Sequence, residues 1–182
     1  SAFSGCSSLV SINIPIGVSA IKSRAFYGCS SLIEITIPES VTSIGDFTFA
    51  YCSSLISVNI PDNITNIAEY SFFNCSSLTN ITIPDSVTSI GGWAFYHCES
   101  LTSITIPDSV TSIGTAAFEN CSNLKSVYCK PTTPPILKNT NVFNGNTSSR
   151  KIYVPAASVD DYKNAAVWTN YADEIFADPT EN

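Results

Sequence analysis

The side chains best suited to chemistry in this 182-residue chain are seven cysteines, one histidine and fifteen acidic residues. Cysteine thiolates bind zinc, attack substrates or pair as disulfides, and a histidine beside a serine or cysteine can serve as a general base. Clustered carboxylates bind Ca²⁺. Which of these chemistries is available depends on where the fold places the side chains, and the spacing of the residues indicates that placement.

Six of the cysteines follow a strict period of 23 residues, at Cys6, Cys29, Cys52, Cys75, Cys98 and Cys121. Phenylalanine and leucine keep the same step, at Phe3, Phe26, Phe49, Phe72, Phe95 and Phe118, and at Leu9, Leu32, Leu55, Leu78, Leu101 and Leu124. A period of about 20–29 residues is typical of leucine-rich repeats, in which each unit supplies one strand and stacks on its neighbours. The six cysteines are therefore expected to form one column through the stack.

Such a column disfavours both disulfides and zinc. Parallel Cβ vectors at the spacing of the coils stay farther apart than the roughly 3.8 Å that a disulfide prefers. A flat column also lacks the four converging ligands of a structural zinc site. We expect free, buried thiols with a packing role, and Cys129, which is in register with Ile106, is expected to fill the core in the same way.

The other reactive groups are equally isolated. His97 occupies a variable corner of a single coil, and neither a phosphate-binding glycine loop nor a His-Glu-x-x-His motif occurs. Four acidic residues follow the strand-ending prolines of successive coils, at Glu39, Asp62, Asp85 and Asp108. One carboxylate per coil supplies few ligands for Ca²⁺, and acidic residues are ordinary turn formers. We therefore expect no enzyme, no cofactor and no metal site.

The strand can be placed within the unit, using the fifth copy as the type. Leu101-x-x-Ile104-x-Ile106 matches the leucine-rich core, and Pro107 ends the strand because proline lacks the N–H that a ladder requires. Val110-x-x-Ile113-Gly114 then crosses the back of the coil, and Ala94 to Cys98 makes the last corner. The predicted fold is an α/β solenoid, a right-handed leucine-rich repeat coil with a parallel sheet on one face and a C-terminal α-helical cap.

Three segments are predicted: six 23-residue repeats over residues 1–130 with the first one truncated, a degenerate seventh repeat over 131–157, and a helical cap over 158–182. Val142-Phe143 and Ile152-Tyr153-Val154 resemble parts of the unit. Ser158 and Asp161 predict a capping box. Helical spacing then predicts packing against the end of the stack by Val159, Tyr162, Ala165, Ala166, Trp168, Tyr171, Ile175 and Phe176. Because the sequence starts inside a unit, we expect it to be a fragment of a longer protein.

The repeated Ala-Phe-x-x-Cys-Ser-Ser-Leu-x-Ser-Ile-Thr-Ile-Pro-Asp-Ser-Val-Thr-Ser-Ile-Gly resembles the BspA-like leucine-rich repeat family over residues 2 to about 130. This family occurs on the surfaces of bacteria and of some mucosal protozoa. The resemblance implies a secreted or surface-attached solenoid that binds other macromolecules, with adhesion to host proteins as its most frequent role. It implies an extracellular or cell-surface location and brings no catalytic residue.

Charge narrows the choice of partner. The net charge is −7, and residues 25–124 hold nine acidic side chains without a lysine or arginine. Nucleic acid is excluded because its binding requires a basic face. A transmembrane segment is excluded because no apolar run approaches about 18 residues. We expect a protein or glycan partner on a host surface or matrix. We also expect a monomer, with self-association through the uncapped N-terminal coil as the alternative.

The candidate binding surface comprises the positions that vary within an otherwise fixed unit. The residue before each Ala-Phe pair is Arg24, Phe47, Tyr70, Trp93 or Ala116, and nearby corner positions hold Tyr27, Tyr51, Phe73, Tyr96 and His97. Aromatic side chains that project outward would form a strip typical of interface hot spots and sugar-stacking sites. The alternative is that they fold over the corner and seal the edge of the core.

A second candidate face consists of outward strand residues, among them Asn59, Thr82, Thr105 and Tyr128. Their hydroxyl and amide groups can bond a protein edge or a glycan, or they can simply form the solvated face of the sheet. Two functions are therefore predicted as alternatives. One is an extracellular binding module for protein or glycan recognition, and the other is a structural spacer that presents another domain from the cell surface.

Overall fold

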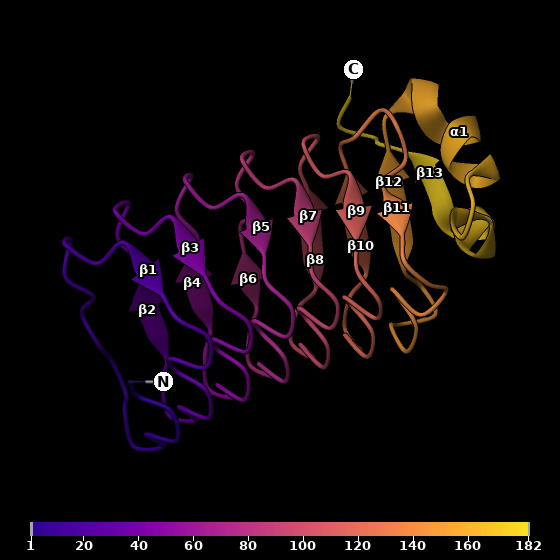
Figure 1. Cartoon of the computed structure of the whole chain (residues 1–182). Coiled ribbons are helices and arrows are strands. Elements are labelled where there is room, and N and C mark those ends of the chain that lie inside the picture. The colour runs from indigo at the N-terminus through magenta and orange to yellow at the C-terminus, as the bar shows by residue number, and fades with distance from the viewer. Residues whose placement is uncertain (1, 182) are drawn as a thin grey trace.

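The computed structural model describes residues 2–181, so Ser1 and Asn182, the outermost residues of the predicted segments, lie outside it. The chain is a solenoid of stacked coils with short helices at its C-terminal end (Figure 1). One row of parallel strands runs along the stack and comprises β2 (Glu34–Thr36), β4 (Ser57–Asn59), β6 (Asn80–Ile81), β8 (Ser103–Ile106), β10 (Ser126–Cys129), β12 (Lys151–Val154) and β13 (Ile175–Ala177). This architecture confirms the predicted leucine-rich repeat solenoid.

The register of this row follows the repeat. Strand β8 ends at Ile106, directly before Pro107, and β10 pairs with it so that Cys129 lies opposite Ile106. Strand β12 continues the row with Ile152 opposite Val127. The strand position and the register of Cys129 are therefore confirmed. The boundaries of the predicted segments stay predictions.

A second row of two-residue parallel strands crosses the back of the coils, where the sequence predicted only a crossing segment. These strands are β1 (Ala20–Ile21), β3 (Ser43–Ile44), β5 (Asn66–Ile67), β7 (Ser89–Ile90), β9 (Ser112–Ile113) and β11 (Ile136–Leu137). In each strand the second residue is buried and the first is at least partly exposed, as expected for a strand that covers a core. The solenoid therefore has backbone ladders on two of its faces.

The back row is interrupted between β3 and β5, next to Ala68. The equivalent residue is Gly45, Gly91 or Gly114 in other coils, where a Cβ would lie 2.3–2.6 Å from the backbone of the preceding coil. Those glycines let adjacent coils approach closely enough for strand pairing. The Cβ of Ala68 requires a wider separation, which accounts for the missing pairing between β3 and β5.

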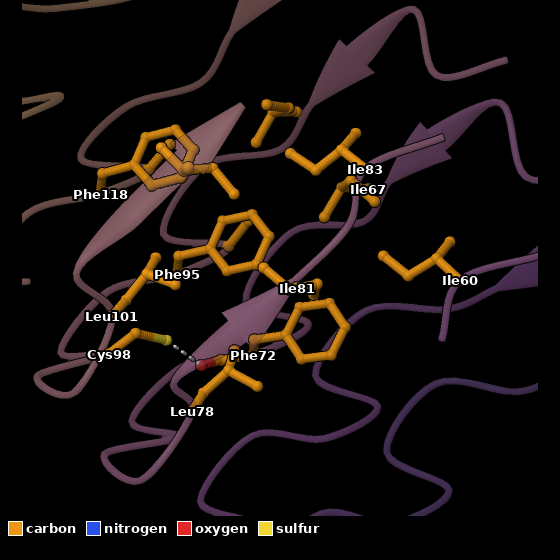
Figure 2. Close-up of a cluster of buried hydrophobic side chains, with 14 of the residues drawn as sticks. Ile60, Ile67, Phe72, Leu78, Ile81, Ile83, Phe95, Cys98, Leu101 and Phe118 are labelled. Carbon is orange, nitrogen blue, oxygen red and sulfur yellow. Dashed lines mark hydrogen bonds between the residues drawn. The ribbon is translucent and has the colours of Figure 1, made fainter. Parts of the chain in front are cut away.

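The core consists of columns of identical side chains (Figure 2). Buried phenylalanine rings stack along the solenoid with centroids 5.1–5.6 Å apart, and Phe143 extends this column beyond Phe118. Each buried repeat cysteine donates a hydrogen bond to the carbonyl of the phenylalanine in the preceding coil, such as Cys98 Sγ to Phe72 O at 3.3 Å. All seven thiols are free, in agreement with the prediction.

Cys6 departs from the prediction because it is exposed, whereas the other six cysteines are buried. No described coil precedes the coil of Cys6, so its side chain lacks the covering layer that its counterparts have. Burial raises the pKa of the Cys75 and Cys98 thiols well above the ordinary value. These thiols are therefore neutral hydrogen-bond donors at physiological pH.

The C-terminal region corrects several predictions. It contains the 3₁₀ turn η1 (Ala156–Ser158), the helix α1 (Val159–Asn164), the 3₁₀ helix η2 (Trp168–Glu174) and strand β13. Ser158 makes no side-chain cap hydrogen bond because the preceding turn gives it helical rather than extended backbone angles, so the capping box is wrong. The helix stops before Ala165, which is extended. Phe176 lies in β13 and is exposed rather than packed.

Aromatic side chains of this region close the end of the stack as predicted for Tyr162, Trp168 and Tyr171, which are buried. Trp168 Nε1 donates to Pro135 O and Tyr162 Oη donates to Pro131 O, each at 2.7 Å. Lys130 Nζ lies 2.6 Å from Asp178 Oδ2, which ties the tail to the last complete repeat. Across residues 2–181, no helix has the length and hydropathy needed to cross a membrane.

Candidate binding surface

The variable position before each Ala-Phe pair forms a stacked row along one corner of the solenoid. The ring of Phe47 lies 4.3 Å from that of Tyr70, which lies 5.0 Å from that of Trp93, and both pairs are parallel to within 4°. The guanidinium of Arg24 sits 5.0 Å from the centre of the Phe47 ring. The three rings are half-buried. They cover one another's faces, so the edges of the rings face outward.

The backbone of this row adopts the left-handed region, with φ of 56° at Phe47 and Tyr70 and 53° at Trp93. That conformation costs an L-residue roughly 1–2 kcal/mol and is normally given to glycine or asparagine. The other left-handed column of the solenoid largely obeys this rule, with Gly28, Asn74 and Asn120 among its members. Backbone preference therefore does not explain why the corner row is aromatic.

A second aromatic row lies beside the first and includes Tyr27, Tyr51, Phe73 and Tyr96. Its neighbouring ring centroids are 5.0–5.4 Å apart, and the Tyr70 and Phe73 rings connect the two rows at 5.8 Å. Tyr51 is tilted from both neighbours and is 41% exposed. The seven aromatic residues of the two rows are called the aromatic surface below.

A groove of about 500 Å³ opens between the two rows at their N-terminal end. Five members of the aromatic surface line it together with Ser4 and Arg24: Tyr27, Phe47, Tyr51, Tyr70 and Phe73. The aromatic surface thus combines ring edges, tyrosine hydroxyls and one guanidinium within a concave region. Such a combination can bind a ligand that has both apolar and polar groups.

The polar candidates lie on the strand face instead. Thr82 and Thr105 are exposed, whereas Tyr128 is half-buried and stacks on Tyr153 at 5.0 Å. The amide of Asn59 is occupied, because its Oδ1 accepts a hydrogen bond from Ile37 N at 2.9 Å and its Nδ2 donates to Ile37 O at 3.0 Å. The predicted residues therefore fall on two surfaces, and Asn59 has a structural role in one of them.

The strand face also contains a depression of about 680 Å³ where β6 and β8 are not paired with each other. Thr82 and Thr105 line it, with Asp85 and Asp108 at its margin. Lys130, its one cationic lining residue, already binds Asp178. The strand face is thus polar and acidic, in contrast to the aromatic surface.

The single histidine has ordinary surface partners. His97 Nδ1 lies 3.2 Å from Glu99 Oε1, and its Nε2 lies 3.3 Å from Asn120 Nδ2. Its ring contacts the edge of Tyr96, at the C-terminal end of the aromatic surface. Within the described part of the chain, no three His, Cys, Asp or Glu side chains lie close enough together to hold a metal ion.

Comparison with known protein families supports the repeat architecture of the chain. The sequence model of the BspA type leucine rich repeat region matches in six copies, over residues 1–98 and 42–170. The chain belongs to the BspA-type leucine-rich repeat family. Leucine-rich repeat proteins are generally non-enzymatic repeat modules, which is consistent with the ordinary surroundings of His97.

Solved structures that resemble the chain include leucine-rich repeat proteins from bacteria. The leucine rich repeat protein of T. pallidum is 26% identical to this chain, with a TM-score of 0.66. The alignment covers 90% of this chain and 82% of that protein. The chain is 28% identical to a leucine-rich repeat protein from Bacteroides ovatus (TM-score 0.60; 81% of this chain, 48% of that one). A leucine rich cell surface protein from Faecalibacterium prausnitzii is 27% identical (TM-score 0.58; 82% and 56%).

The chain thus spans only about half the length of two of these leucine-rich repeat proteins. No curated protein matches it. One of these relatives is described as a cell surface protein. Among the groove residues, Ser4 was not a candidate from the sequence. Arg24 was already part of the variable column of Phe47, although only the aromatic members of that column were expected to form a binding strip.

Proposed function

We propose that the chain is a binding module of an extracellular or cell-surface leucine-rich repeat protein, and that it recognises a protein or glycan through the aromatic surface. The observation that carries the proposal is the concentration of aromatic side chains on one corner of successive coils. The core positions of the repeat unit are nearly invariant, whereas several of its outward positions vary. Among the outward positions, bulky aromatic side chains are concentrated at this corner, which is typical of recognition and is not required by packing of the core.

Energetics support this assignment. Phe47, Tyr70 and Trp93 keep bulky side chains at left-handed positions, where glycine or asparagine would be less strained. Their stacking offsets part of that cost, since an aromatic pair contributes about 0.5–1.5 kcal/mol beyond its buried area. Stacking also fixes the rings before a ligand arrives, so that binding sacrifices little side-chain entropy. A rigid, partly exposed aromatic row is therefore well suited to be an interface hot spot.

The alternative function is that of a spacer. It is favoured by the self-contained stacking of Phe47, Tyr70 and Trp93, which leaves only ring edges exposed. It is also favoured by Ala116, which ends the row in the next coil. A spacer requires stable coils but no ligand, so the two functions differ in what the rings contribute.

The experiment is a binding screen of the purified chain against host matrix proteins and mucin glycoproteins. The triple variant Phe47→Ala/Tyr70→Ala/Trp93→Ala should lose binding, whereas Thr82→Ala/Thr105→Ala on the strand face serves as the matched control. The free energy of unfolding of each variant is measured in parallel. A large loss of stability with unchanged binding in the triple variant, or no binding by the native chain to any partner, would favour the spacer.

A further inference from the structure

The groove of the aromatic surface contains an unpaired cation in an otherwise acidic body. Arg24 and Lys22 are the only arginine or lysine residues before Lys125. Arg24 is exposed, and its guanidinium rests over the Phe47 ring, where it lines the groove. Within residues 2–181, the four salt bridges involve other side chains. The guanidinium is therefore free to pair with an anionic group of a ligand.

No carboxylate lines the groove in the described part of the chain. Asp46 and Glu69 immediately precede Phe47 and Tyr70, yet they line a different depression, together with Trp93 and Lys138. The corner row thus separates acidic side chains from the groove. A single negative charge can approach Arg24, whereas the nine acidic residues of the surrounding body disfavour a ligand with a dense run of negative charge.

The remaining groove walls suit a sugar ring. Tyr51 is tilted by 62° from Tyr27 and by 55° from Phe73, so no parallel ring covers its faces. Tyr51 is 41% exposed, and an exposed aromatic side chain of this kind can stack on the C–H face of a pyranose. Tyr27, Tyr51 and Tyr70 add hydroxyl groups that donate and accept hydrogen bonds. Burial, with a smaller effect of Glu69, raises the pKa of Tyr70, which keeps its hydroxyl a neutral donor.

We propose that this groove binds a carboxylate-bearing sugar unit of a glycan, with Arg24 pairing the carboxylate and Tyr51 stacking on the ring. This inference rests on the proposed function and specifies its ligand class. The volume of about 500 Å³ lies within the range of small-ligand sites and is large enough for one or two sugar units. Sialic acids and hexuronic acids share this chemistry, and the test distinguishes them.

The test measures binding of 3′-sialyllactose, of a disaccharide that ends in glucuronic acid, and of lactose as the neutral probe, by calorimetry and saturation-transfer NMR. At least one acidic sugar should bind about tenfold more tightly than lactose. Arg24→Gln should abolish this preference. Lys22→Gln, the matched control, removes the same charge two residues away and outside the groove, and should leave the preference unchanged. The acidic sugar that binds identifies the source of the carboxylate.

Equal affinity for lactose and both acidic sugars, an equal effect of Lys22→Gln, or absence of sugar binding would overturn the inference. Its failure is distinguishable from failure of the proposed function. Mucin is therefore also tested after removal of its sialic acids. If this mucin binds equally well, and if the Arg24→Gln variant binds mucin normally while the triple aromatic variant does not, the aromatic surface binds something other than an acidic sugar.

Discussion

Replacing Gly91 with alanine should open the back of the solenoid between β5 and β7. A Cβ at this residue would lie 2.6 Å from Glu69 N and 2.8 Å from the carbonyl carbon of Ala68, so the adjacent coils must separate. Two backbone hydrogen bonds flank the β5–β7 ladder at this boundary, from Thr88 N to Thr65 O and from Gly91 N to Ile67 O. Pairing is absent where Ala68 occupies the equivalent place next to β3.

The magnitude follows from these contacts. The two flanking backbone hydrogen bonds contribute about 1 kcal/mol each, and the expected loss comprises these two bonds alone. Replacing glycine restricts the unfolded chain and recovers about 0.4–1 kcal/mol. The net loss should be about 1–1.5 kcal/mol, which corresponds to a melting temperature lower by about 2–6 °C for a chain of this size.

Urea unfolding followed by circular dichroism measures this loss, and amide hydrogen exchange at Thr88 reports on the boundary itself. The control is Gly17→Ala, because a Cβ at Gly17 meets nothing within 4 Å. That variant should be as stable as the native chain or slightly more so. Unchanged stability of Gly91→Ala, with the Thr88 amide as protected as before, would refute the steric explanation for the interrupted ladder.

Three further predictions concern other parts of the fold. Ala68→Gly should stabilise the chain by about 0.5–1 kcal/mol because it permits β3 to pair with β5, whereas an alanine-to-glycine substitution usually destabilises a protein. A lower free energy of unfolding in urea would contradict this prediction. A thiol reagent should label Cys6 alone in the native chain and all seven cysteines in denaturant, with Cys6→Ser as the control. Labelling of the buried thiols in the native chain would contradict this prediction. The hydrogen bonds from Lys130 and Thr180 lower the pKa of Asp178 to about 2, against about 3.9 in an unfolded chain. The ionised Asp178 carboxylate therefore contributes to stability above about pH 4, and this contribution is lost as the pH falls toward 2. Asp178→Asn should remove this part of the pH dependence of the unfolding free energy, and parallel profiles for the two proteins would contradict it.

The main features of the fold could be predicted because they are repeated and have strong local signals. Pro107 and the alternation of Ile104 and Ile106 locate a strand, and the period places its neighbours. The back strands could not be recognised because each is only two residues long. The effect of Ala68 depends on how closely another coil approaches one Cβ, which the local sequence does not reveal.

The C-terminal end shows the limit of helical spacing as a signal. The intervals predicted a second helical turn or two from Trp168 through Phe176, and the 3₁₀ helix η2 follows a break at Ala165 and Val167 but ends at Glu174. Phe176 belongs to a strand that pairs with β12. These outcomes depend on contacts with distant parts of the chain and not on the intervals themselves.

The candidate surface was visible in the sequence as variation within a fixed unit, but its geometry was not. Stacking of Phe47, Tyr70 and Trp93 depends on a left-handed backbone that the residue types disfavour. Asn59 was expected to face a ligand. Because β2 ends at Thr36, the backbone N–H and C=O of Ile37 lack a strand partner, and they bind the Asn59 amide instead.

The central claim is that the aromatic surface binds the ligand. Its most direct test is the affinity for a mucin glycoprotein. The dissociation constant is measured for the native chain, for the Phe47→Ala/Tyr70→Ala/Trp93→Ala variant and for the Thr82→Ala/Thr105→Ala variant, under conditions in which each protein is folded. The account predicts at least about thirtyfold weaker binding for the aromatic variant, as expected for loss of a hot spot, and a change below about threefold for the strand-face variant. Binding that survives the aromatic substitutions, or that is lost with the two threonines instead, would contradict it.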